Sequence, residues 1–173
     1  MNVKRITDCL DKIQWRYSVA DEKTVITGYR CTVPFYEYSV PIEIRLTEHW
    51  VTIFALLQQE IAPDRLPTVA SFLSALNSQC RSVRFFLVQD CAVLQAEVPA
   101  SRFHIGSFME ALKNVCRYSS ITGLEVSVLI TNRSVADLYR EIGLSSLPFF
   151  KLTSLRADEA LSDFDISANK LTD

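Results

Sequence analysis

With 173 residues, of which 49% are hydrophobic and 22% charged, the chain has the composition of one globular domain and not of a disordered protein. Its formal net charge of -2 argues against nucleic-acid binding, because no global positive charge attracts phosphates. No segment approaches the roughly 20 apolar residues of a membrane-spanning helix, and the N-terminus lacks a secretory-signal pattern. We therefore expect a cytoplasmic protein with no membrane association.

The cysteines and glycines exclude several kinds of site. The five cysteines are odd in number and widely spaced, without a C-x-x-C, which argues against a disulfide framework and against a zinc site. The four glycines are isolated, so the sequence has no phosphate-binding loop and no dinucleotide fingerprint. We expect reduced thiols, no metal and no cofactor.

The first half of the chain predicts a helix, three strands and a second helix. Apolar residues recur at helical spacing over 3–13, and 24–33 is β-branched and extended. After an interruption at 34–39, residues 40–57 alternate in polarity and predict two further antiparallel strands. The apolar stripe of 69–77 predicts the second helix, which we expect to end near Asn77.

The next segment predicts a second hairpin and a third helix. Residues 83–98 form two short apolar runs that end at a proline, and Ser101 is a candidate cap for the helix that follows. Phe108, Leu112 and Val115 would line one face of that helix. The order is then α-β-β-β-α-β-β-α, an α+β fold with helices packed on an antiparallel sheet.

Downstream, the pattern predicts a C-terminal extension. Residues 124–131 (LEVSVLIT) have the β-branched content of a strand, and 134–143 (SVADLYREIG) resemble a helix closed by glycine. We expect a single domain over 1–150 and an acidic, loosely docked or mobile tail over 151–173.

The turns fix the register of both predicted hairpins, because opposed residues share one face of a sheet. We place the first turn at Glu48–His49 and the second at Asp90–Cys91, with a four-residue loop of the same parity as a fallback for the second. The expected pairs run from Leu46–Val51 through Ile44–Ile53 to Val40–Leu57 in the first hairpin, and are Leu87–Leu94, Phe85–Ala96, Val83–Val98 and Arg84–Glu97 in the second.

The outer face of these hairpins is only half polar, whereas a solvated sheet face should be polar. Its apolar residues are Trp50, Phe54, Leu56, Phe86, Val88 and Val93. Two explanations stay open. Either another part of the chain, such as the segment with Leu147, Phe149 and Phe150, covers these apolar side chains, or a second copy or another polypeptide binds to them. The second explanation makes these six side chains candidate partner-binding residues, with Trp50 and Phe54 as anchors.

Catalytic chemistry is not evident in the sequence. His49 falls in a predicted turn and His104 in the first turn of a helix, and no G-x-S-x-G surrounds any serine, so we expect no catalytic residue. Cys91 would be an accessible thiol if it lay in the turn, but no cationic partner is evident beside it, so a buried or unmodified cysteine is favoured. The alternative, a small-ligand-binding protein or an enzyme with an unrecognised site, would need a closed pocket that gathers His104, Arg102 and a carboxylate.

The sequence also has a modest basic cluster, which comprises Arg81, Arg84, Arg102, Lys113 and Arg117. Acidic residues are interleaved with it, so we expect a solvated face.

The element order resembles that of the type III secretion chaperone-like fold. The residue pattern is similar to that of the YbjN-like group within this fold. The segments that carry this resemblance are 85–100 (FFLVQDCAVLQAEVPA) and 65–77 (RLPTVASFLSALN), and it covers about residues 3–118. The chain departs from it at Cys91, where a glycine would suit the turn. Members commonly dimerise and hold an extended client segment. The resemblance therefore implies a non-enzymatic homodimer that binds another polypeptide, as a chaperone-like assembly or regulatory factor.

Overall fold

The computed structural model describes residues 1–33, 36–131, 133, 135–141 and 151–155. The helices are α1 (Val3–Lys12), α2 (Leu66–Gln79), the short 3-10 helix η1 (Ala100–Arg102), α3 (Ile105–Ile130) and α4 (Val135–Glu141). The strands are β1 (Tyr17–Val19), β2 (Thr24–Val33), β3 (Tyr36–Leu46), β4 (Trp50–Gln58), β5 (Arg84–Val88), β6 (Cys91–Pro99) and β7 (Lys151–Leu155). The predicted α+β class and element order are confirmed, with the short strand β1 added.

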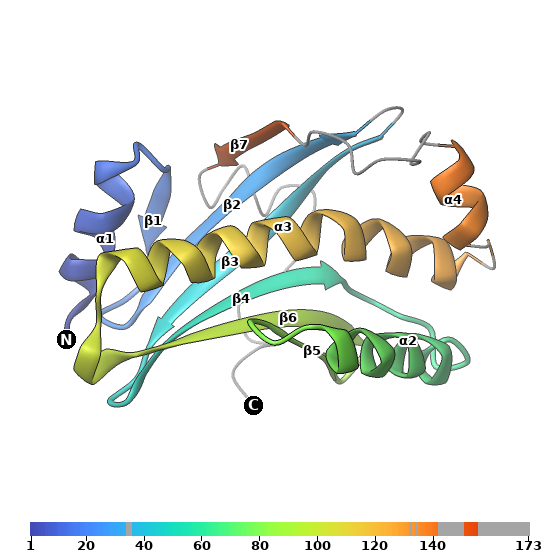
Figure 1. The fold of residues 1–173 in the computed structure, drawn as a ribbon, viewed down its shortest axis with the longest axis horizontal. Helices are drawn as coiled ribbons and strands as arrows, with labels where there is room; N and C mark the ends of the chain where they lie inside the picture. The colour runs from blue at the N-terminus through green and yellow to red at the C-terminus, as the bar shows by residue number, and fades with distance from the viewer. Residues whose placement is uncertain (34–35, 132, 134, 142–150, 156–173) are drawn as a thin grey trace.

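The strands form one antiparallel sheet in the order β1-β2-β3-β4-β6-β5. The last strand of the described chain, β7, pairs with β2, where Leu155 lies opposite Gly28. Figure 1 shows α3 crossing one face of this sheet, with α1 and α2 toward opposite ends of the molecule. Within the described residues, β5 therefore forms one outer edge of the sheet.

The helix α3 packs on the sheet through the predicted residues. Phe108, Leu112 and Val115 are fully or almost fully buried, and they belong to the same core as Ile44 of β3 and Ile53 of β4. The first-hairpin register is confirmed from Leu46–Val51 to Ile42–Ala55. Alternation of apolar and polar residues was a sufficient signal here, because a slip of one residue would expose the whole apolar set.

The predicted register of the second hairpin is wrong by two residues. The turn is Gln89–Asp90, and Gln89 takes the positive φ of 54° that a two-residue turn requires. Phe85 therefore faces Leu94, and Arg84 faces Gln95 instead of Glu97. A shift of two residues keeps every side chain on its predicted face, which is why the apolar pattern could not detect it.

The strand predicted at 124–131 is wrong, because Leu124 to Ile130 continue α3. A β-branched residue disfavours a helix by only a few tenths of a kcal/mol, whereas each residue that extends an existing helix adds a hydrogen bond. Leu124, Val126 and Val128 are also buried in the helical conformation. Propagation and packing together outweigh the local strand preference.

Two further boundaries differ from the prediction. The cap of α3 is His104 and not Ser101, because the intervening residues form η1. The interruption expected at 34–39 is wrong over 36–39, since Tyr36 to Ser39 belong to β3 and pair with β2. Long antiparallel pairing with β2 supplies the hydrogen bonds that extend β3.

The C-terminal predictions are only partly within the described chain. The predicted helix is present as α4, but Gly143 lies outside the described residues, as do Leu147, Phe149 and Phe150. Lys151 to Leu155 form β7, and 156–173 lie outside the described residues. The division into a domain over 1–150 and a tail over 151–173 stays a prediction.

Candidate functional site

A second, smaller apolar cluster lies on the sheet face opposite the helices. We call it the outer cluster; it comprises Phe54, Leu56, Phe86, Val88, Cys91 and Val93. Val93 is its centre, because it faces Leu56 across the β4–β6 pair and Phe86 across the β5–β6 pair. Residues opposite one another in antiparallel strands project to the same side, so three strands contribute to one surface.

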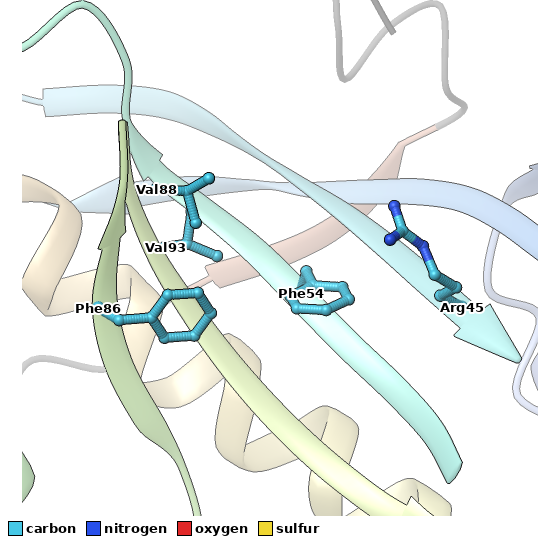
Figure 2. A pocket seen from close by; sticks show the side chains of 5 residues that line it. All are labelled: Arg45, Phe54, Phe86, Val88 and Val93. Carbon is cyan, nitrogen blue, oxygen red and sulfur yellow. The ribbon is translucent and has the colours of Figure 1, made fainter. Parts of the chain in front are cut away.

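The outer cluster has a buried floor and a partly exposed rim. Val93 is 1% exposed and Leu56 is 7% exposed, whereas Phe54, Phe86 and Val88 are half-buried. Together with Arg45, all of these except Leu56 line a hollow of about 50 Å³ (Figure 2). The rim side chains can therefore contact an apolar group from another molecule, while the floor residues support them.

Arg45 gives the hollow a polar side. Its Nη2 lies 2.6 Å from Oε1 of Glu43, and its Nε donates a hydrogen bond of 2.8 Å to the same oxygen. The guanidinium carbon lies 5.6 Å from the centre of the Phe54 ring, within cation–π range. The carboxylate of Glu43 and the ring of Phe54 thus fix the Arg45 side chain beside the hollow.

Five of the six predicted partner-binding residues come together in the outer cluster, and Trp50 does not. Trp50 lies at the start of β4, opposite Pro99, and is 42% exposed. Cys91 was missed as a member. Cys91 is the first residue of β6 and is 8% exposed, which agrees with the buried cysteine that the sequence favours over an accessible thiol. The alternation that starts at Val93 would have assigned Cys91 to the same face.

The side chain of one histidine, His104, has a structural role in the described chain. His104 caps α3, where its Nδ1 accepts a hydrogen bond of 3.0 Å from the Gly106 amide. His49 lies in the β3–β4 connection, and its backbone carbonyl accepts a hydrogen bond of 2.8 Å from the Ala100 amide.

Among the residues that the structure describes, no three or more His, Cys, Asp or Glu side chains converge as metal ligands. No helix in that part of the chain is both long and apolar enough to cross a bilayer.

A buried polar network between the sheet and α3 was not predicted. The Tyr29 hydroxyl donates to the Cys116 carbonyl at 2.9 Å and lies 2.7 Å from Oγ of Ser119 and 2.9 Å from Oγ of Ser120. Burial raises the pKa of Tyr29 well above its ordinary value. Each polar group in this contact has a partner, as buried polar groups require. The network fixes the position of α3 over β2.

Glu125 extends the polar contacts toward the end of α3. Its side chain is buried and accepts a hydrogen bond from the hydroxyl of Tyr139 on α4. Burial raises the pKa of Glu125, because the charged form loses its hydration. The residue was overlooked because the segment around it was predicted to be a strand.

We expect Glu125→Gln to increase stability near neutral pH. Because its pKa is raised, Glu125 binds its proton more tightly in the folded state than in the unfolded state, so stability should fall as the pH rises from the ordinary carboxyl pKa through the raised one. Glutamine is uncharged and keeps an acceptor for Tyr139. Urea unfolding of both proteins between about pH 4 and pH 7 measures the difference. Equal pH slopes in the two proteins would contradict the assignment.

The fold and the outer cluster define an α+β protein in which one sheet face packs against helices and the other carries a separate apolar cluster. The family described as T3SS (YopN, CesT) and YbjN peptide-binding chaperone 1 matches residues 31–122. Because this match spans more than half of the sequence, the chain belongs to that family. The predicted resemblance is thereby confirmed.

A solved structure supports the fold independently. The crystal structure of YbjN from E. coli is similar to this chain with a TM-score of 0.56 and 16% sequence identity. The similarity covers 73% of this chain and 91% of that one. Among curated proteins, no significant match was found.

Proposed function

We propose that this protein is a cytoplasmic, non-enzymatic, chaperone-like factor that binds an apolar segment of another polypeptide at the outer cluster. Membership of a family described as peptide-binding supports the proposal. The observation that carries it is the half-exposed rim of Phe54, Phe86 and Val88 around a hollow. Half-buried aromatic side chains in a concave setting are the kind of anchor on which binding energy concentrates.

The homodimer predicted from the sequence is part of this proposal. Trp50 supports it, because a tryptophan that is 42% exposed is an unusual surface residue and a frequent interface anchor. Trp50 stands outside the outer cluster, so a second copy and a client segment need not compete for the same side chains.

The double variant Phe54→Asp, Phe86→Asp is expected to weaken peptide binding by roughly tenfold or more, because two charges would replace the apolar rim. An immobilised array of apolar nine-residue peptides supplies the probe, and fluorescence anisotropy with the best peptide gives the affinity. Light scattering on the same samples, with a Trp50→Asp variant, reports the homodimer.

Val19→Asp is the matched control for the double variant. Val19 lies on β1, is 53% exposed and does not belong to the outer cluster. The Val19→Asp variant should leave the affinity for the peptide unchanged. If the double variant is folded by circular dichroism and binds the peptide as well as the Val19→Asp control does, the outer cluster is not the binding site.

A further inference from the structure

The edge strand β5 is bonded by a side chain from α2. The amide nitrogen Nδ2 of Asn77 donates to the carbonyl of Phe85 at 2.6 Å, and the amide of Phe85 donates to Oδ1 of Asn77 at 2.8 Å. A neighbouring strand would make the same pair of hydrogen bonds through its own peptide groups. The Asn77 side chain therefore imitates one residue of an added strand.

The two Asn77 bonds also show which backbone groups of β5 point outward. In an antiparallel pair, the N–H and C=O of one residue point to one neighbour and those of the next residue point to the opposite side. Since the groups of Phe85 point to Asn77, those of Leu87 point to the same edge. No further strand lies beyond β5 in the described part of the chain (Figure 1).

The contact with α2, which supplies Asn77, is the device that protects the β5 edge in the described chain. Natural edge strands carry lysine, proline or a bulge, or are covered by another element. The sequence RFFLV has one charge, at Arg84, and its other residues are aromatic, aliphatic or β-branched, which favours strand pairing. Phe86 and Val88 are half-buried on the outer face. Asn77 thus occupies hydrogen-bonding groups at the edge of a strand whose composition favours pairing with another strand.

The strand β5 is also complementary to itself. If two copies paired antiparallel about Phe86, Phe85 of each copy would face Leu87 of the other, and both residues present their backbone groups to that edge. The two Phe86 rings would meet, and each Arg84 would face a Val88, so no like charges would oppose one another. A second copy of this chain therefore fits the edge in both hydrogen bonding and charge.

We propose that Asn77 closes the β5 edge against a second copy of this chain, and that removing its amide lets two β5 strands pair about Phe86. This inference is independent of peptide binding at the outer cluster. It assigns to Asn77 a role in limiting self-association, in addition to its place at the end of the apolar stripe of α2.

The experiment compares Asn77→Ala with the natural chain by size-exclusion chromatography with light scattering. We expect the apparent mass of the variant to be twice that of the natural chain at the same concentration. Ser78→Ala, an exposed neighbour on the same helix, should leave the mass unchanged. Adding Phe86→Lys to Asn77→Ala should restore the lower mass, because two lysines would then face each other.

Hydrogen exchange tests the edge first in the natural chain and then in the variant. In the natural chain the Phe85 amide should be protected by Asn77, whereas the Leu87 amide should exchange quickly; in Asn77→Ala, pairing should slow Leu87. A protected Leu87 amide in the natural chain overturns the proposal. So does an unchanged mass in folded Asn77→Ala, or association that survives Phe86→Lys.

Discussion

Ser127→Pro is expected to destabilise the protein by about 3 kcal/mol or more and to reduce its helical circular dichroism. Ser127 lies in the last turn of α3, where proline removes the hydrogen bond of the residue's own backbone N–H and its ring clashes with the preceding turn. Urea unfolding, followed at a helical wavelength, measures both effects. If the segment were the strand that its composition suggests, the helical signal would not change.

Ser127→Ala is the control for this substitution. The serine Oγ bonds only to the carbonyl of Leu124 within its own helix, at 2.8 Å, among the contacts of the described chain. Alanine keeps the helical backbone, so we expect a change within about 0.5 kcal/mol. A proline variant as stable as the alanine variant would show that 124–130 do not continue the helix.

Phe108→Ala is expected to cost about 3–5 kcal/mol, because the deletion of a buried aromatic ring removes hydrophobic burial and leaves a cavity. Phe108 is fully buried where α3 meets the sheet, and its ring centre lies 5.6 Å from that of Phe103. Urea unfolding at constant pH gives the change in free energy. A loss of less than about 1 kcal/mol would mean that the site collapses or that the ring is not in the core.

Trp50→Ala removes a larger aromatic ring from the outer face and provides the contrast. Because Trp50 is 42% exposed, we expect a loss of about 1 kcal/mol or less. The comparison separates residues that hold the fold together from residues available to a partner. A larger loss for Trp50 than for Phe108 would reverse the assignment of the two sheet faces.

The candidate site was predictable as a face but not as a list of accessible residues. Alternation assigned Phe54, Phe86 and Val93 to the outer side, because the side-chain period of a strand is two. The sequence could not show that Val93 lies beneath its neighbours while Phe54 and Phe86 stay half-exposed. That difference depends on which strands lie side by side. Strand β4 pairs directly with β6, although α2 and β5 lie between them in the sequence.

Local patterns in the sequence by themselves determined the α+β class, the first hairpin and the face on which each strand residue lies, because periodicity acts over a few residues. Tertiary structure decided the rest. Packing on the sheet made Leu124 to Ile130 helical, and Asn77 reached Phe85 only because α2 lies beside β5. These outcomes depend on contacts between elements, which no local pattern of residues encodes.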